Sequence, residues 1–325
     1  MSIDLLHNWT ILHGSPGYKY DYSSDLEINS DGSIYITGST TGDLNGQLNS
    51  GGQDAFISKF NSNGNEEWTT LISVGYHSWS NNLEIDANGS LYIVGTLTEE
   101  DYVSGGVIYS GDRKNFISKF NSEGRKEWTK LISIYQDGII KDLEIDINGA
   151  LYITGSTKGN VNNQISNGGR DAFISKFNSN GVEEWTTLLG SIESDSAKDI
   201  AISSDGSLYI TGDTFGNLDN QSNNDLPNDN FTTDDIFISK FNSNGRKQWT
   251  RLFGSTSFDD SKDLEIGPDG NIFITGDTLG KFSDQKFNGW QDIFISKFDS
   301  KGNNIWHTLC NLPYRVQTVS LDPRN

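Results

Sequence analysis

The sequence predicts an all-β fold built from a repeated unit. A motif of the type Glu-Trp-Thr-x-Leu recurs with its Trp at positions 9, 68, 128, 185, 249 and 306, so neighbouring copies lie 57 to 64 residues apart. Within each interval, short runs rich in Ile, Tyr, Phe and Thr alternate with period two and are bounded by Gly and Asn turns, which is typical of strands joined by hairpins. No segment has a sustained helical period.

Each unit contains four predicted strands, here called A to D in chain order. In the first copy they are residues 26–28, 33–38, 54–60 and the segment around Trp68. The turn Asp31-Gly32 separates A from B, and Asn63-Gly64 separates C from D. Asp or Asn followed by Gly suits such turns because the Asx side chain bonds to the backbone and Gly adopts positive φ. The B–C and D–A loops vary from copy to copy.

Four antiparallel strands in a unit of this length predict one blade of a β-propeller. An immunoglobulin-like array has a longer period of roughly 100 residues. Strands A, B and C occur five times, which predicts five blades from residue 9 to about residue 310, in a single domain spanning 1–325 with a tail at 311–325. An N-terminal strand at Trp9 is expected to complete the last blade, so the strand at Trp306 is an extra outer strand. Residues 319–323 match the start of a sixth inner strand, and either an enlarged fifth blade or a truncated sixth accounts for this tail.

One run also carries a family resemblance. Residues 171–181, Asp-Ala-Phe-Ile-Ser-Lys-Phe-Asn-Ser-Asn-Gly, followed by Trp185, resemble the bacterial SBBP-type β-propeller repeat, common in large cyanobacterial and other bacterial proteins. The match recurs five times and covers roughly residues 9 to 321. The resemblance implies a propeller fold and no single activity. Hemolysin-type calcium repeats often accompany this family, but their nonapeptide run is absent from the chain, so the resemblance does not by itself imply calcium.

Composition disfavours several classes of function. The formal net charge is -20, which opposes binding to nucleic acid and to anionic lipid. One Cys, Cys310, leaves no intrachain disulfide or thiolate metal cluster. The N-terminus lacks a basic segment followed by an apolar one, so we expect a cytoplasmic protein, or an extracellular one if the chain is part of a larger exported protein.

Features that recur in all copies are assigned to the scaffold. The Gly that ends strand B indicates crowding of the backbone (Gly38, Gly95, Gly155, Gly212 and Gly276). The outer Trp is expected to pack between neighbouring blades. Counting through the C–D hairpin places Lys59 opposite Glu67 and Lys119 opposite Glu127, as cross-strand ion pairs.

Strand A carries a repeated Glu that has two interpretations. Glu27, Glu84, Glu144 and Glu265 occupy equivalent positions, and Ala201 breaks the series. On the innermost strand of a ring these carboxylates would cluster near the central channel and either raise one another's pKa or recruit a cation, Ca²⁺ first because its oxygen ligands are numerous and irregular. Alternatively, each Glu turns sideways into a salt bridge between blades.

The variable loops are the expected functional surface, because loops on a rigid frame carry function. Aromatic and acidic residues outside the repeat pattern gather there, and the candidates are Tyr20, Tyr22, Tyr76, His77, Trp79, Tyr102, Tyr135, Asp137, Asp195, Phe258, Asp259 and Trp290. Exposed aromatic rings beside carboxylates suit stacking on sugar rings or gripping a protein. Alternatively, the rings fold back and pin the long loops.

The sequence therefore favours a binding or scaffolding protein, lectin-like in character, with a glycan or a protein as partner. An enzyme acting on a glycan or small molecule is the alternative, with a carboxylate pair drawn from Asp21, Asp137, Asp195 or Asp259. No nucleophile elbow, P-loop or His-Glu-x-x-His motif is present, and only His77 of the four His lies on the variable loops.

Overall fold

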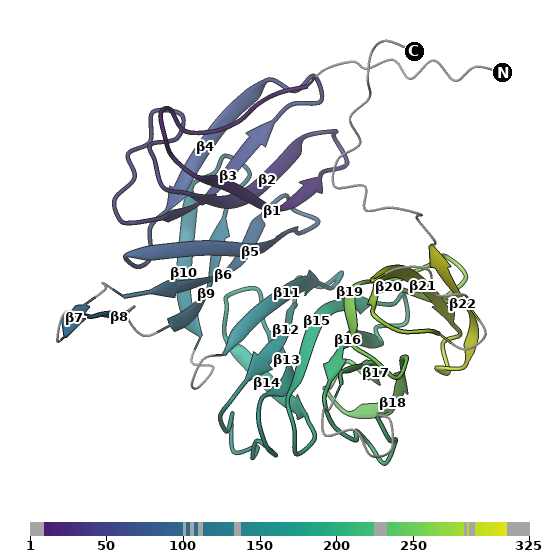
Figure 1. Ribbon diagram of the computed structural model, residues 1–325. Helices are drawn as coiled ribbons and strands as arrows, with labels where there is room; N and C mark the ends of the chain where they lie inside the picture. Colours follow the sequence, from purple (N-terminus) through teal and green to yellow (C-terminus); the bar gives the residue numbers. More distant parts are fainter. Residues whose placement is uncertain are drawn as a thin grey trace, which may run out of the picture. The chain divides into compact units, whose positions relative to one another are not determined.

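The computed structural model describes residues 10–99, 102–104, 107–109, 113–132, 138–223, 233–282, 285 and 290–310. Every regular element in these residues is a β-strand, and none is a helix (Figure 1). Twenty strands form five four-stranded antiparallel sheets, and two short strands form a separate hairpin.

The five sheets share one topology, in which chain order equals spatial order. Sheet 1 contains β1 (Asp21–Ile28), β2 (Ile34–Thr40), β3 (Asp54–Phe60) and β4 (Glu66–Ile72). Sheet 2 contains β5 (His77–Ile85), β6 (Leu91–Thr98), β9 (Arg113–Phe120) and β10 (Lys126–Ile132). Sheet 3 contains β11 (Ile139–Ile145), β12 (Leu151–Thr157), β13 (Asp171–Phe177) and β14 (Glu183–Leu189). Sheet 4 contains β15 (Asp195–Ile202), β16 (Leu208–Thr214), β17 (Asp235–Phe241) and β18 (Lys247–Phe253). Sheet 5 contains β19 (Asp259–Ile266), β20 (Ile272–Thr278), β21 (Asp292–Phe298) and β22 (Asn304–Cys310). The separate hairpin pairs β7 (Tyr102–Ser104) with β8 (Val107–Tyr109), between β6 and β9 in sequence.

This topology confirms the predicted order of strands A to D and the Asx-Gly turns. Gly32 adopts φ 82°, and Asp31 accepts a hydrogen bond from the backbone N–H of Ser33 at 2.8 Å. Because each sheet is an antiparallel meander, its B–C loop and the D–A connections leave the same end; Thr40 pairs with both Asp21 and Asp54. We call this end the rim.

A β-bulge interrupts strand A of every sheet at the same place. In β1 the register shifts between Ser23 and Asp25, which leaves Ser24 as the extra residue. The bulged backbone lies against the Gly of strand B: a Cβ on Gly38 would come within 1.9 Å of the Tyr22 carbonyl oxygen. The other four glycines of this set meet a strand-A carbonyl in the same way, at 1.9 to 2.2 Å. The predicted backbone crowding is confirmed, and the bulge is its cause.

The repeated Trp side chains lie between neighbouring sheets, as predicted. A Cβ on Gly124 of sheet 2 would lie 2.7 Å from the Trp68 ring of sheet 1. The Trp128 ring meets Gly181 in the same way, and the Trp249 ring meets Gly302. A turn without a side chain therefore makes room for the indole of the preceding sheet.

The predicted Lys–Glu pairs form as well. Lys59 lies 2.9 Å from Glu67, and Lys119 lies 3.1 Å from Glu127. Each ammonium also lies over the aromatic ring of strand B, 5.7 Å from the centroid of Tyr35 in the first copy. The recurrent Lys thus shields a large buried ring on one side and pairs with a carboxylate on the other.

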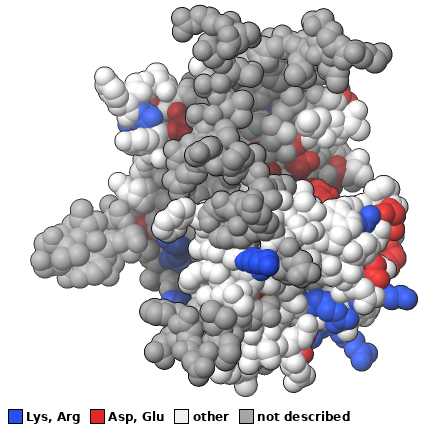
Figure 2. All heavy atoms as spheres, turned by 45° about the vertical axis from the view of Figure 1, so that its right-hand side comes forward, with Lys and Arg blue, Asp and Glu red and all other residues white. Residues whose placement is uncertain are grey.

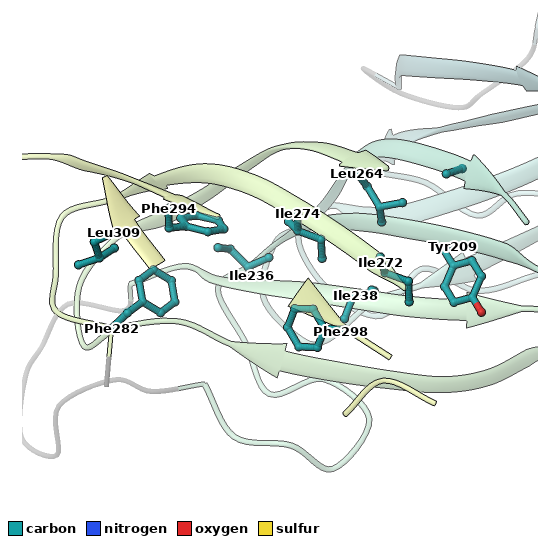
Figure 3. Packing of buried hydrophobic residues seen from close by; sticks show 11 residues of the cluster. Tyr209, Ile236, Ile238, Leu264, Ile272, Ile274, Phe282, Phe294, Phe298 and Leu309 are labelled. Atoms are coloured by element: carbon teal, nitrogen blue, oxygen red, sulfur yellow. The ribbon is translucent and has the colours of Figure 1, made fainter. Parts of the chain in front are cut away.

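The chain divides into two compact units, and each is described by itself. Unit 1 comprises Met1–Gln164 with Ile174–Thr186, and unit 2 comprises Ile165–Phe173 with Thr187–Asn325. In unit 1, Leu83 and Ile93 of sheet 2 pack against Tyr35 and Ile57 of sheet 1. In unit 2, Leu264, Ile272 and Ile274 of sheet 5 pack on Tyr209, Ile236 and Ile238 of sheet 4 (Figure 3). The cores are therefore layers between consecutive sheets.

Polar side chains next to the bulge also connect consecutive A strands. The carboxylate of Asp25 accepts a hydrogen bond from the backbone N–H of Leu83 in sheet 2 at 2.8 Å. Asn82 in turn donates to Asp142 of sheet 3 at 2.7 Å. In unit 2, Asp199 accepts from the backbone N–H of Leu264 at 2.5 Å.

Substitution of Asp25 tests this connection. We expect Asp25→Ala to lower the free energy of unfolding by roughly 1 to 3 kcal/mol, because the Leu83 N–H loses its acceptor. Asp25→Asn keeps an acceptor oxygen and should cost less than half as much in the same urea titration. Equal losses for the two variants would show that the hydrogen bond is not responsible.

The two ends of the described chain differ from the expectation in one respect. The fourth strand of sheet 5 is β22, which carries Trp306, whereas Thr10, Ile11 and Leu12 form no strand. Instead, His13 lies over sheet 1, where its Nε2 is 2.9 Å from Ser58 Oγ. Trp9 and residues 311–325, where a sixth inner strand is expected, lie outside the described residues.

Candidate functional site

The rim of unit 1 carries a pair of exposed tyrosines. Tyr20 precedes β1 and Tyr22 lies within it, and their rings are stacked at 12° with centroids 6.4 Å apart. Their residues are 68% and 58% exposed. The backbone N–H of Tyr20 donates to Thr41 at the end of strand B, which fixes the approach to the strand. The two rings lie nearly parallel, and both residues are open to solvent.

A second aromatic group lies at the same end of sheet 2. The His77 ring meets Tyr76 edge-on at 4.7 Å and stacks with Trp79 at 5.6 Å. The Trp79 indole donates to the Gln53 side chain at 2.8 Å, and Gly52 donates from its backbone to the Tyr76 carbonyl. This group holds the B–C loop of sheet 1 against the start of β5. His77 and Trp79 therefore act as the alternative interpretation expected, with rings that fold back and hold a long loop. Tyr76 is 41% exposed.

One rim position changes chemistry from sheet to sheet. The position is on strand A, one residue before the two residues between which the register shifts. In sheets 1 to 5 it is occupied by Tyr22, Trp79, Ile139, Ser196 and Asp260. Its strand-B partner is Ser39, Thr96, Ser156, Asp213 and Asp277. The strand-A residue is therefore aromatic in sheets 1 and 2, and an Asp stands on strand B in sheets 4 and 5.

The acidic positions line a pocket in unit 2 with a volume of about 470 Å³. Its wall includes Asp195, Lys198, Asp213, Phe258, Asp260 and Gln291. These residues come from strand A, strand B and the rim loops of sheets 4 and 5. On the face drawn in Figure 2, acidic side chains gather in several groups, and Lys or Arg side chains lie next to some of them.

Two lysines at the bulge position hold the pocket acids together. Lys198 Nζ lies 2.8 Å from Asp213 and 3.2 Å from Asp260. Lys262 Nζ contacts Asp260 and lies 3.5 Å from Asp277. Asp213 also accepts a hydrogen bond from the backbone N–H of Ser261 at 2.8 Å. The network links sheet 4 to sheet 5.

Burial sets the protonation of these carboxyls. Burial raises the pKa of Asp213 to about 7, although Lys198 and the Ser261 N–H favour its charged form. Burial also opposes ionisation of Asp260, but Lys262 and Lys198 outweigh it and hold its pKa below the ordinary value. Burial raises the pKa of Asp195 to about 6 against the hydrogen bonds from Ser191 and Thr214. Burial therefore brings the pKa values of two pocket carboxyls, Asp195 and Asp213, closer to neutral pH.

Two predicted rim acids prove to be buried. Asp195 and Asp259 are 1% and 0% exposed. Each begins strand A and accepts a hydrogen bond at 2.6 Å from the backbone N–H four residues earlier, Ser191 and Ser255 respectively. Both therefore close a turn, and Asp259 does not line the pocket. Both carboxylates are buried where an exposed rim was expected, because a turn-closing carboxylate and an exposed one look alike in sequence, and their role in ligand binding stays a prediction.

The other predicted rim residues are distributed as follows. Phe258 lines the pocket and is 44% exposed, and Trp290 is 95% exposed. Tyr102 lies in β7, and its side chain is not among those described. Tyr135 and Asp137 lie outside the described residues. The sequence interpretation missed Lys198, Asp213 and Asp277. The two aspartates could have been found by comparing copies, because the fourth and fifth copies have Ile-Thr-Gly-Asp-Thr where the first and third have Ile-Thr-Gly-Ser-Thr.

The strand-A glutamates lie away from the rim. Glu84 pairs with Tyr92 near the A–B turn, as Glu27 pairs with Tyr35 and Glu144 with Tyr152. Burial, together with repulsion from Glu144 and Glu27, raises the pKa of Glu84 to about 9. Glu265 belongs to unit 2. Among the residues the structure describes, no three His, Cys, Asp or Glu side chains are grouped so as to hold a metal ion, and the Ca²⁺ expectation stays a prediction.

Comparison with known proteins assigns the repeat. Residues 184–219 match a family described as SBBP, a beta-propeller repeat. This segment is an SBBP β-propeller repeat. The matched segment runs from strand D of sheet 3 through strands A and B of sheet 4, so it includes the bulge, its Gly and the pocket residues Lys198 and Asp213.

Other proteins are similar to this chain in sequence or in structure. An uncharacterized WD repeat-containing protein of Acanthamoeba polyphaga mimivirus is 25% identical over 80% of this chain, and the chain spans only 25% of that relative. A protein of unknown function from Dyadobacter fermentans has a TM-score of 0.55 at 8% identity, covering 92% of this chain and 85% of its own. A catalytically inactive virginiamycin B lyase from Staphylococcus aureus, solved with quinupristin, has a TM-score of 0.50 at 13% identity, covering 93% and 74%. These likenesses show the fold.

A search of the described residues for helices found none with the length and apolar character needed to cross a membrane.

Proposed function

We propose that this SBBP-repeat chain is a binding module, a closed five-bladed propeller whose rim takes a glycan. The support comes first from the surfaces of the two end sheets. Leu26 and Ile28 of β1 are 52% and 62% exposed, whereas the equivalents of Leu26 in the next sheets are at most 3% exposed (Leu83, Leu143, Ile200 and Leu264). At the other end, Ile293 is 45% exposed and its equivalent Ile236 is fully buried.

The two exposed faces are of the two types that pack on each other between consecutive sheets within each unit. In unit 1, Leu83 packs on the face of sheet 1 that carries Tyr35 and Ile57. In unit 2, Leu264 packs in the same way on the face of sheet 4 that carries Ile236. Exposed apolar faces on the first and last sheets support closure of the ring, because a closed propeller has no open end sheet that leaves such a face in water.

The glycan proposal is carried by the stacked, exposed Tyr20–Tyr22 pair. Two parallel rings on a rigid strand form a surface that stacks on the apolar face of a sugar at little conformational cost.

A glycan array tests this proposal. We expect binding to a restricted group of glycans, weakened about threefold to tenfold in Tyr20→Ala and in Tyr22→Ala, since stacking on an aromatic ring contributes roughly 0.5 to 1.5 kcal/mol. Trp290→Ala, which removes an equally exposed ring from unit 2, is the matched control and should leave binding unchanged. No binding to the array, with capture of a protein by the same tyrosines, would favour the protein partner instead.

The enzyme alternative is favoured by one observation. Asp195 and Asp213 line one pocket and have pKa values raised to about 6 and about 7, a range that suits proton transfer at neutral pH. A hydrolysis screen with glycans and small esters would detect turnover. Turnover that disappears in Asp213→Ser would overturn the proposal that the chain only binds.

A further inference from the structure

We propose that another pocket of unit 2 binds the acetamido group of an N-acetylated sugar. This pocket, here called the amide pocket, has a volume of about 500 Å³, and its wall includes Asn167, Ile192, Glu193, Phe215, Asn217 and Asn223. It is separate from the tyrosine pair, and the inference does not depend on glycan binding there. Three observations carry it: hydrogen bonds fix its loops, its free polar groups match a secondary amide beside apolar side chains, and the fold does not require these side chains.

Hydrogen bonds hold the loops of the amide pocket in place. The backbone N–H of Phe215 donates to the Ser194 carbonyl at 3.0 Å, which joins the B–C loop of sheet 4 to the connection that precedes the sheet. Within the B–C loop, the backbone N–H of Asn223 donates to Asn217 Oδ1 at 3.0 Å. The Asn223 side chain donates to the Thr214 carbonyl at 3.1 Å. The pocket is therefore formed before a ligand arrives, which lowers the entropic cost of binding.

Two side chains in the wall keep free hydrogen-bonding groups of opposite kinds. Because Asn217 Oδ1 accepts the bond from Asn223, the Nδ2 group of Asn217 is left as a donor. Glu193 is exposed, and its carboxylate, which accepts hydrogen bonds, has no partner among the described residues. A secondary amide matches this pair, because its carbonyl oxygen accepts and its N–H donates.

Apolar side chains accompany these groups in the same wall. Ile192 is 79% exposed, and Phe215 is partly buried. Covering such side chains with a methyl group removes apolar surface from water. An acetamido group therefore offers a methyl to Ile192 and Phe215 and an amide to Asn217 and Glu193.

A further side-chain amide favours a sugar over a peptide as the carrier of this group. The side chain of Asn167 makes no hydrogen bond within the part of the chain that the structure describes, and an amide both donates and accepts. Sugar hydroxyls also do both. A peptide presents its other hydrogen-bonding groups along an extended backbone, which suits the edge of a strand better than separate side chains on loops.

The fold does not require the side chains that give the amide pocket its chemistry. The two loops meet in sheet 5 as they do in sheet 4, since Gly280 faces Ser255 there as Gly216 faces Ser191. Sheet 5 nevertheless has Thr256, Ser257 and Lys281 at the positions of Ile192, Glu193 and Asn217. The frame is thus shared, and the exposed residues on it differ between the two copies, as expected of loops that carry function.

Saturation-transfer difference NMR with N-acetylglucosamine tests the proposal, with glucose as the matched sugar that lacks the acetamido group. We expect the acetyl methyl protons to receive the strongest saturation, and glucose to bind about tenfold more weakly or less. Asn217→Asp removes the donor and keeps an acceptor for the Asn223 N–H, as Asp43 does for Asn49 in sheet 1. This variant should weaken binding about tenfold. Glu193→Ser, which installs the residue of sheet 5, should weaken it about threefold to tenfold.

Matched controls separate the amide pocket from other parts of the chain. Asn160→Asp makes the same change at the same loop position of sheet 3 and should leave the affinity within about twofold. Equal weakening by Asn160→Asp and Asn217→Asp, or equal binding of glucose, would overturn the proposal. Loss of the signal in Tyr22→Ala would place the sugar at the tyrosine pair instead. Binding of N-acetylalanine methylamide as tight as that of N-acetylglucosamine would overturn the choice of a sugar.

Discussion

Replacing Gly155 with Ala should destabilise the protein by roughly 3 kcal/mol or more, among the largest effects of any single methyl group in this chain. The added Cβ would lie 1.9 Å from the carbonyl oxygen of Ile139 and 3.0 Å from its carbon. Both atoms belong to the backbone of β11, which is held by the bulge between Ile140 and Asp142. Backbone on both sides cannot rotate away as a side chain could, so the strands must separate.

Thermal unfolding measures the effect. A loss of this size corresponds to a fall in Tm of roughly 6 to 12 °C for a domain of this size class. Gly149→Asn is the control in the same sheet, because Asn tolerates the positive φ of 78° and the nearest atom to its Cβ is 3.8 Å away. It should lower Tm by no more than about a third as much. A Tm for Gly155→Ala equal to that of the control would refute the role of the bulge contact.

Replacing Glu84 with Gln should stabilise the protein at neutral and alkaline pH. Burial, with Glu144 and Glu27 as neighbours, raises the pKa of Glu84 to about 9, whereas an unfolded glutamate titrates near its ordinary value of 4.5. Between these two values the folded state binds more protons than the unfolded state, so the free energy of unfolding falls as pH rises. Gln keeps the shape of the protonated acid and cannot ionise, so the variant escapes this loss.

The pH profile distinguishes this effect from a general change in packing. Near pH 4.5 the variant and the unaltered chain should have similar stability, and the gap should grow with pH to about 4 kcal/mol at pH 8, seen as a Tm higher by roughly 8 to 16 °C. Glu127→Gln, which removes an exposed partner of Lys119, should change stability by less than about 1 kcal/mol at either pH. A gap that does not depend on pH would contradict the assignment. The cation prediction is tested by adding Ca²⁺ to the unaltered chain and to Glu84→Gln. A bound ion would raise the Tm of the unaltered chain and leave the Tm of the variant unchanged.

Much of the scaffold was predictable because each copy repeats its constraints. A Gly at the same place in five units indicated contact with backbone, and Lys59 beside Glu67 followed from counting through one hairpin. These interactions are local or lie between adjacent strands, so spacing along the chain is enough to locate them. The β-bulge was not foreseen, because an extra residue in a strand has no composition of its own.

The candidate site was harder to predict because its chemistry arises between sheets. Asp195 stood among rim residues as an expected ligand, yet its carboxylate closes a turn and only one oxygen is left for the pocket. Lys198 was overlooked because its role depends on Asp260, which is 62 residues further along the chain and next to it in space. Comparing copies position by position would have found Asp213 and Asp277, since they replace Ser in an otherwise constant run.

The bulge in strand A also divides one strand into two independent parts. In β5 the buried positions before the bulge are Ser78 and Ser80, and after it the buried position is Leu83, so the alternation changes phase at the extra residue. The second half of the strand is committed to the layer between sheets, whereas the first half faces the rim. Residues such as Tyr22 and Asp260 can therefore be exchanged without altering which side chains enter the core. In such a repeat the residues of the core and the residues of the rim can change independently. Tandem copies can therefore carry different side chains at the same rim position while keeping the same sheet topology and core packing.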